Sequence, residues 1–276
     1  MFRRQQRRNP HTAPNTCDSE TVAGSSRRSF KVVAAAEAEA GSGKVWLVGA
    51  GPGPADLLTL RAAKLLKHAD TVIYDDLLSQ ELVDLSSDTA ELIYVGKRGG
   101  QASTPQEDIN TLLVEKFRAG KQVVRLKGGC CTVFSRARPE IEALTQAGCE
   151  VELVPGVSSA LAGPLSAGVC LTDRLLSRHF AVTSAHSPGS LDWSIFKGID
   201  TLVVLMGGRK LEEVTKRLQD EAMHEATTPV AVIRSAAMEE EEIWDGTLGT
   251  IVEKTAGQQL SPCIVIVGEV VRDRLR

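Results

Sequence analysis

The first candidate for a chemical site is a segment rich in glycine and proline, residues 49–54. It follows the apolar run at residues 45–48. Its glycines, Gly49, Gly51 and Gly53, can adopt positive φ angles and allow a ligand to lie against the main chain. Apolar residues then return at helical spacing over residues 57–66. A strand, a tight loop and a helix in this order predict one wall of a binding site, because open α/β sheets bind ligands at the carboxyl ends of their strands.

A dinucleotide-binding loop is the first alternative for this segment. Gly49 and Gly51 match the first two glycines of the G-x-G-x-x-G pattern, and Asp75 lies where an acidic residue would bind a ribose. However, Pro54 stands at the third glycine position, and neither Pro52 nor Pro54 has an amide hydrogen to offer a pyrophosphate. The pattern therefore disfavours a nicotinamide or flavin cofactor.

The elements that must position this loop alternate between strands and helices as far as residue 156. Each predicted strand ends in Gly, Asp or Pro, which is typical of a parallel α/β domain. One helix is expected to begin at residues 103–106, with Ser103 or Thr104 as its cap and Pro105 in its first turn. The strands predicted after the first are residues 71–74, 91–95, 122–127 and 151–154.

A second set of strands and helices follows residue 156. Ser158 is expected to cap a helix that ends at Gly168, and further helices are predicted at residues 211–218 and 251–255. The chain is therefore divided into two α/β lobes, residues 44–156 and 157–276, with the active site expected in the cleft between them. The strands predicted for the second lobe are residues 180–184, 200–206, 229–233, 243–248 and 261–268.

Composition limits the classes of function. The chain has 276 residues and a net charge of −3, so its body lacks the basic signature of a nucleic-acid-binding protein. No apolar run is long enough to span a bilayer. The six cysteines and five histidines show no metal-ligand spacing, so no metal is expected.

Ten short segments between residues 45 and 268 together resemble one family, the tetrapyrrole (class III) methyltransferases. Two of them, at residues 94–98 and 105–110, favour the branch that acts on uroporphyrinogen III over the precorrin, diphthine and ribosomal-RNA branches. The segments are Val48-Gly-Ala-Gly-Pro-Gly53, Leu57-Leu-Thr-Leu-Arg61, Tyr74-Asp75, Tyr94-Val-Gly-Lys-Arg98, Pro105-Gln-x-x-Ile109-Asn110, Val124-Arg-Leu-Lys-Gly-Gly129, Val154-Pro-Gly-Val157, Leu205-Met206-Gly207, Thr228-Pro-Val-Ala231 and Ser261-Pro262.

This resemblance implies a homodimer that binds S-adenosyl-L-methionine in the cleft and methylates carbons 2 and 7 of uroporphyrinogen III, giving precorrin-2 for siroheme. It assigns catalytic roles to Asp75 and Lys97. Because the substrate carries many carboxylates, Arg98, Arg136 and Arg174 are expected to anchor it. The cofactor contacts that the resemblance implies are Pro52, Gly128, Gly129, Cys130, Val133, Ser158, Ser159, Met206 and Ala236.

Several of these residues also have ordinary structural explanations. An aspartate after a strand is often a helix cap, and Ser158 taken alone is a helix cap as well. Arginine and lysine side chains in loops are usually solvated, and Met206 taken alone would be a core residue.

The chain departs from the family pattern in the loop after Gly129. Cys130 and Cys131 stand where the family has Asp-Pro, and Ser135, Ala137 and Arg138 stand where it has glycines. A neutral thiol is a poor acceptor, so the cofactor contact weakens unless the backbone carries it. The loop is also expected to change shape, since it lacks the proline and the three glycines of the family pattern, and these residue types determine the backbone conformation.

Two interpretations of this departure stay open. In the favoured one, a divergent plastid enzyme keeps the reaction with an altered loop. In the other, the fold is a non-catalytic or regulatory protein that binds a tetrapyrrole or the cofactor; methylation of a different tetrapyrrole is a further alternative. The two cysteines are either a redox switch or, more simply, small residues packed under the loop.

The first 43 residues differ from the rest of the chain. As far as Lys31 they contain seven basic residues against only Asp18 and Glu20, together with many Ser and Thr residues. An Arg-rich, Ser-rich and acid-poor segment is typical of an organelle transit peptide, and the family favours the chloroplast. A disordered basic tail or a nucleic-acid-binding arm is the alternative.

Overall fold

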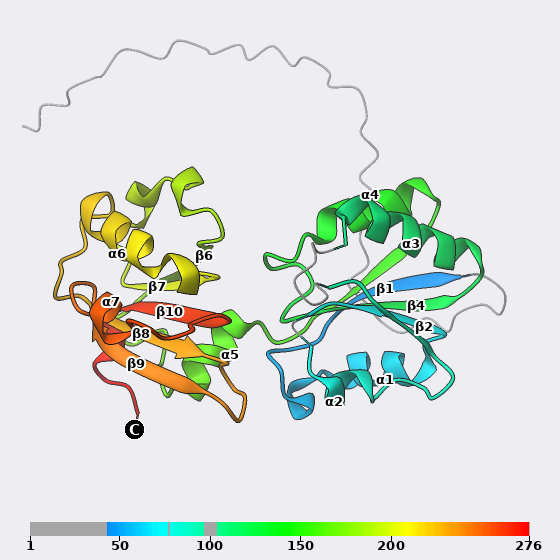
Figure 1. The fold of residues 1–276 in the computed structure, drawn as a ribbon, viewed down its shortest axis with the longest axis horizontal. Coiled ribbons are helices and arrows are strands. Elements are labelled where there is room, and N and C mark those ends of the chain that lie inside the picture. Colours follow the sequence, from blue (N-terminus) through cyan, green and yellow to red (C-terminus); the bar gives the residue numbers. More distant parts are fainter. Residues whose placement is uncertain (1–42, 77, 97–103, 276) are drawn as a thin grey trace, which may run out of the picture. The chain divides into compact units, whose positions relative to one another are not determined.

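The computed structural model describes residues 43–76, 78–96 and 104–275, which form two β-sheets with helices on their faces (Figure 1). The expected transit peptide lies outside the described residues, apart from its last residue, Gly43. The predicted two-sheet α/β class is confirmed, and residue 156 lies between the last strand of the first sheet and the helix that begins the second set.

The first sheet is entirely parallel, with the strand order β3-β2-β4-β1-β5. Helices α1 and α2 cover one face and α3 and α4 cover the other (Figure 1). Its strands are β1 (Lys44–Gly49), β2 (Thr71–Tyr74), β3 (Glu91–Tyr94), β4 (Gln122–Lys127) and β5 (Val151–Val154), and its helices are α1 (Leu60–His68), α2 (Gln80–Val83), α3 (Gln106–Arg118) and α4 (Ala137–Gln146).

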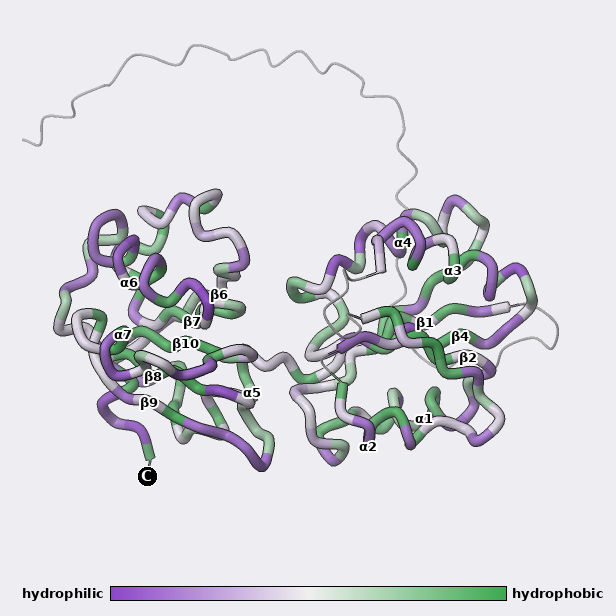
Figure 2. The backbone as a smooth tube through the Cα atoms, in the orientation of Figure 1, coloured by the Kyte–Doolittle hydropathy of each residue, from purple (hydrophilic) through white to green (hydrophobic). Residues whose placement is uncertain are grey.

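Successive side chains of β1 point to opposite faces of this sheet, and both faces are packed against helices. Val45 and Leu47 pack with the apolar side chains of α3 and α4, whereas Trp46 and Val48 pack with those of α1 and α2. A strand with apolar residues on both faces is typical of a buried parallel sheet. The hydropathy colouring shows the same pattern, with apolar strands between more polar helices (Figure 2).

The start of α3 differs from the prediction. The helix begins at Gln106, and Pro105 is its N-cap residue, with no side chain capping it. Pro105 is therefore one position earlier than expected, at the last extended residue before the helix and not within the first turn.

The second sheet is mixed, with the strand order β6-β7-β10-β8-β9. Only β6 and β7 are parallel to each other, and the remaining pairs are antiparallel. The last strand lies in the middle of this sheet and begins at Cys263, two residues later than predicted. The strands are β6 (Phe180–Ser184), β7 (Thr201–Leu205), β8 (Pro229–Arg234), β9 (Glu242–Thr247) and β10 (Cys263–Gly268), and the helices are α5 (Ser159–Ser166), α6 (Leu211–Asp220) and α7 (Ile251–Lys254).

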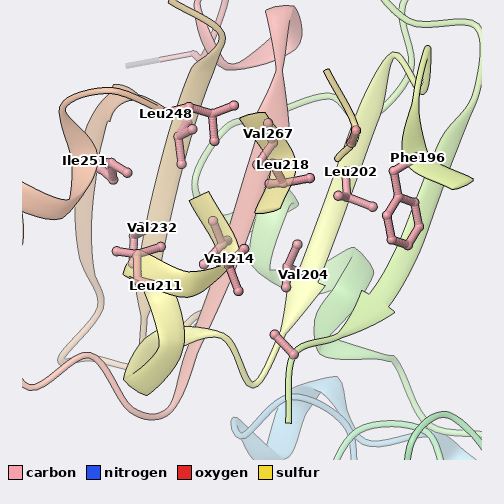
Figure 3. Close-up of a cluster of buried hydrophobic side chains, with 14 of the residues drawn as sticks. Phe196, Leu202, Val204, Leu211, Val214, Leu218, Val232, Leu248, Ile251 and Val267 are labelled. Atoms are coloured by element: carbon pink, nitrogen blue, oxygen red, sulfur yellow. The ribbon is translucent and has the colours of Figure 1, made fainter. Parts of the chain in front are cut away.

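Helix α6 packs on the second sheet through one apolar face. Leu211, Val214 and Leu218 recur at helical spacing and contact the buried side chains of β7, β8 and β10 (Figure 3). The opposite face of the sheet is covered by α5, whose residues belong to a second buried cluster with those of β7, β8 and β10. Shortening a buried leucine here to alanine is expected to cost about 2–5 kcal/mol of folding free energy.

Candidate active site

The loops after three strands of the first sheet meet at its carboxyl edge. Parallel strands place all their carboxyl ends on one side, so Gly49 at the end of β1, Gly129 after β4 and Gly156 after β5 come together. A side chain on Gly49 would lie 2.5 Å from the nitrogen of Gly156 and 2.6 Å from the carbonyl oxygen of Gly129. Glycine is required at Gly49 because three backbones approach one another there.

Backbone hydrogen bonds hold two of these loops in register. The amide of Ala50 donates to the carbonyl of Lys127 at 2.8 Å, and Gly51 and Gly129 exchange amide-to-carbonyl bonds of 3.1 and 2.8 Å. Gly129 has a φ of 65°, and a side chain there would lie 3.8 Å from the nitrogen of Ser159. The structure thus brings Gly129 and Ser159 together, two of the residues expected to contact the cofactor.

Ser158 is a helix cap, as its structural explanation predicted. Its hydroxyl accepts a hydrogen bond from the amide of Ala160 at 3.3 Å, at the start of α5. The amides of the first turn of α5 are therefore next to Gly129. A helix N-terminus beside half-buried glycines offers a ligand backbone donors and close approach to the main chain.

The thiol of Cys130 lies close to several hydrogen-bond donors. Burial opposes its ionisation, but the backbone amides of Thr132, Gly156 and Val133 and the hydroxyl of Thr132 outweigh that effect and lower the pKa of Cys130. The Thr132 hydroxyl is 3.6 Å from the sulfur. The backbone here favours an anion at position 130, which is the charge that a carboxylate would carry.

Cys131 has the opposite environment. Burial raises the pKa of its thiol to about 11, and the thiol donates to the carbonyl of Val154 at 3.4 Å. Of the two adjacent cysteines, Cys131 packs inside the first lobe, as its simpler explanation predicted, while Cys130 is half-buried.

The rest of this loop contains strained backbone. Phe134 and Arg136 have φ values of 50° and 54°, which cost a non-glycine residue on the order of 1–3 kcal/mol. Val133 and Arg136 are both exposed, and Pro52 is half-buried in the loop after β1. Apolar and basic side chains on this loop are thus open to a ligand, but no contact of Arg136 identifies it as a substrate anchor.

Three expected site residues belong to the second sheet or its flanking loops. Met206 follows β7, has a φ of 59° and is exposed, so it is not the core residue that its type alone suggested. Ala236 follows β8 and would lie 3.2 Å from a side chain on Gly163 of α5. Arg174 is exposed in the turn between Asp173 and Ser177. Residues of this turn line a surface depression of about 690 Å³.

Asp75 directly follows β2 at the same carboxyl edge as the glycines. Its carboxylate accepts a hydrogen bond from Nη2 of Arg125 at 2.9 Å, and 31 % of its side chain is exposed. Arg125 itself is almost fully buried in β4. Asp75 is therefore a carboxylate at the surface of the site, held from beneath by a buried cation, and not a helix cap. The other expected catalytic residue, Lys97, and the expected anchor Arg98 lie outside the described residues.

Sequence reasoning missed the charged group beneath Asp75. Glu140 of α4 is completely buried and accepts hydrogen bonds from Nε of Arg125 at 3.2 Å and from Nζ of Lys127 at 2.8 Å. Burial, followed by the repulsion of Arg125, lowers the pKa of Lys127, and Glu140 opposes that shift. Charges at positions 125 and 127, in a strand that is buried from Val123 onward, were the available signal.

Residues 43–76, 78–96 and 104–275 can also be considered for membrane-spanning helices and metal sites. No helix in these ranges is long and apolar enough to cross a membrane. Within the same part of the chain, no group of three or more His, Cys, Asp and Glu side chains is placed to hold a metal ion.

Known proteins are similar to this chain in sequence and in fold. Residues 44–252 match the profile of the tetrapyrrole (corrin/porphyrin) methylases. The chain is similar to the uroporphyrinogen-III C-methyltransferase of Synechococcus elongatus, with 43 % identity over 233 residues that cover 84 % of this chain and 96 % of the relative. It is 44 % identical over 236 residues to the enzyme of the same name from Methanocaldococcus jannaschii, covering 83 % of this chain and 97 % of that one.

A solved structure agrees with the sequence matches. Uroporphyrin-III C-methyltransferase from Thermus thermophilus, complexed with S-adenosyl homocysteine, is similar with a TM-score of 0.73 and 38 % identity, covering 83 % of this chain and 99 % of that chain. The profile match over residues 44–252 and the identity to these relatives show that this chain belongs to the tetrapyrrole methylase family.

Proposed function

We propose that this protein is a methyltransferase that uses S-adenosyl-L-methionine to methylate carbons 2 and 7 of uroporphyrinogen III, giving precorrin-2 for siroheme. The observation that carries the proposal is the carboxyl edge of the first sheet, where Asp75 and the cradle of Gly49, Gly129 and Gly156 share one end of the strands. Relatives at 43 % and 44 % identity have the corresponding name, and the similar solved structure holds S-adenosyl homocysteine.

The described residues fit this cofactor. Half-buried glycine backbone at residues 128–129 and the first turn of α5 allow close approach and offer amide donors. Cofactor contacts are proposed for Pro52, Gly128, Gly129, Cys130, Val133, Ser158, Ser159, Met206 and Ala236. When bound, S-adenosyl-L-methionine supplies a methyl group already activated on a sulfonium.

The chain's own contribution is to orient the substrate and stabilise charge. Alignment of a carbon nucleophile with an activated methyl group accounts for much of the rate enhancement in such a reaction. Positive charge develops on the macrocycle as the new carbon–carbon bond forms, and the Asp75 carboxylate is proposed to stabilise that charge or accept the proton that leaves. Lys97, Arg98, Arg136 and Arg174 are proposed to bind substrate carboxylates.

The test is to incubate residues 44–276 anaerobically with S-adenosyl-L-methionine and uroporphyrinogen III and to count methyl groups on the tetrapyrrole by mass spectrometry. Two methyl groups per macrocycle are expected. One methyl group would indicate a different product, and cofactor binding without any methylation would favour a binding or regulatory protein with the same fold.

We also propose that the protein is a homodimer, as the family resemblance implied. Leu161 and Leu165 lie one turn apart on α5 with exposed side chains. Leu175, in the turn between Asp173 and Ser177, is exposed as well. Such side chains suit a surface covered by a second copy. Light scattering should give the mass of a dimer, and Leu165→Glu should shift the mass toward that of a monomer; a monomeric wild-type protein would contradict this assignment.

The chloroplast is the proposed location. Residues 1–43 have the composition of a transit peptide, and the family profile begins at residue 44. The segment is thus separate from the part of the chain that the proposed chemistry needs.

A further inference from the structure

Four charged side chains form one connected network beneath the carboxyl edge of the first sheet. Asp75 follows β2, Arg125 and Lys127 belong to β4, and Glu140 is in the first turn of α4. The side chains of Arg125, Lys127 and Glu140 are 3 %, 4 % and 0 % exposed, so Asp75 alone presents this network to the site.

The Arg125 guanidinium is held at all three of its nitrogen atoms. Nε donates to Glu140 at 3.2 Å, Nη2 donates to Asp75 at 2.9 Å, and Nη1 donates to the carbonyls of Ile73 and Leu126 at 3.4 and 3.2 Å. A guanidinium is planar, so its donors point in fixed directions relative to one another. The bond from Nε to Glu140, together with the two bonds from Nη1, therefore determines where Nη2 meets Asp75.

Glu140 also balances the charge of this buried group. Its two oxygens accept from Nζ of Lys127 at 2.8 and 3.0 Å, and the network holds two cations and two carboxylates. Without Glu140, two buried cations would share one carboxylate, which is strongly unfavourable. Lys127 would then compete with Arg125 for Asp75 or lose its proton.

We infer that Glu140 is a positioning residue for methyl transfer: it fixes the Arg125 guanidinium, which in turn fixes the Asp75 carboxylate at the surface of the site. The inference rests on the proposed function, because it assigns Glu140 an effect on the step in which Asp75 acts. Glu140 does not touch the substrate or the cofactor in this arrangement; it acts through Arg125.

The helix that carries Glu140 provides a matched control. Glu142 lies on α4 as well, is exposed, and pairs with Arg138 at 2.7 Å four residues before it. Glu140→Gln and Glu142→Gln make the same chemical change two residues apart. Glu140→Gln should lower kcat by roughly tenfold to a hundredfold with little change in KM for S-adenosyl-L-methionine, because a misplaced catalytic group costs rate of that order. Glu142→Gln should leave both constants unchanged.

A second variant separates positioning from charge balance. Glu140→Gln combined with Lys127→Met removes one carboxylate and one cation, so the remaining pair of Arg125 and Asp75 is balanced. Tm should recover in this double variant while kcat stays low. Recovery of kcat together with Tm would show that Glu140 only neutralises Lys127, and would overturn the inference. An equal kcat for Glu140→Gln and Glu142→Gln would overturn it as well.

Two further measurements keep the test informative if a variant or the assay fails. Should Glu140→Gln not fold, Arg125→Lys keeps the charge beside Glu140 but cannot reach both carboxylates, and should show the same loss of kcat. Nitrogen-15 NMR of the Arg125 guanidinium needs no activity: exchange of the Nε proton with water should be slow in the wild type and in Glu142→Gln, and faster in Glu140→Gln, because an amide oxygen is a weaker acceptor than a carboxylate. Equally slow exchange in all three would contradict the inference, whereas an inactive wild type would contradict only the proposed function.

Discussion

Gly49 and Gly156 lie so close together that a side chain on either would enter the backbone of the other. A side chain on Gly156 would lie 2.6 Å from the carbonyl carbon of Gly49 and would also meet the carbonyl oxygen of Gly129. Because Gly49 ends β1 and Gly156 follows β5, this contact joins two of the segments that form the proposed cofactor site.

Gly156→Ala should damage the cofactor site and the fold together. The methyl group has no space among three backbones, so the free energy of unfolding should fall by about 1–3 kcal/mol. Calorimetry should detect weaker binding of S-adenosyl homocysteine. Gly189→Ala in the second lobe is the control, since a side chain there would make only ordinary contacts of 3.4 Å and beyond. Equal effects of the two substitutions would argue against a tightly packed glycine cradle.

The cysteines should differ in reactivity toward iodoacetamide near neutral pH. The amide donors around Cys130 lower the pKa of its thiol, so more of it is thiolate at a given pH than in an ordinary cysteine. Burial raises the pKa of Cys131 and Cys149 to about 11 and that of Cys263 to about 12, so those three should stay unmodified. Peptide mass spectrometry should find that Cys130 reacts at a lower pH than the exposed Cys170, and that S-adenosyl homocysteine protects it. A Cys130 that reacts no faster than Cys170 would contradict this environment.

Cys130→Asp should tighten binding of S-adenosyl-L-methionine. The substitution restores the carboxylate of the family pattern at a position where backbone amides already favour an anion. Cys130→Asn is the neutral control of similar size and should bind no more tightly than the wild type. Weaker binding by Cys130→Asp would show that this loop holds the cofactor in another way.

The first 43 residues should direct a fluorescent reporter into chloroplasts when fused to its N-terminus. Their composition is that of a transit peptide, in which arginine is the main source of charge. Changing Arg3, Arg4, Arg7 and Arg8 to glutamate is the matched control, and microscopy should then find the reporter in the cytosol. A cytosolic reporter with the unchanged segment would contradict the assignment.

The first sheet could be predicted from the sequence because its strands are short apolar runs that end in Gly, Asp or Pro. Burial on both faces removes the alternation of polar and apolar residues that usually identifies a strand. The residues that end each apolar run therefore indicated where the strands lie. By the same reasoning the loop that begins at Gly49 was predicted to be one wall of a binding site, whereas its close approach to Gly129 and Gly156 is known only from the structure.

The charged network and the order of the second sheet could not be predicted. Arg125 and Glu140 are 15 residues apart and Arg125 and Asp75 are 50 residues apart, so no local pattern joins them. Likewise, β10 lies between β7 and β8 because of pairings over long separations in sequence. Residues 105–106 show a smaller limit: Pro105 signals a helix start, but not whether it is the cap or the first residue inside.

The central claim, methyl transfer at the edge that carries Asp75, is tested most directly by transfer of a carbon-13 methyl group from labelled S-adenosyl-L-methionine to uroporphyrinogen III under anaerobic conditions. NMR of the product should place the label at carbons 2 and 7 for the wild type. Asp75→Ala should lose nearly all transfer while still binding S-adenosyl homocysteine, and Asp84→Ala, an exposed aspartate after α2, should behave as the wild type. Labelled product formed by Asp75→Ala at the wild-type rate would contradict the account.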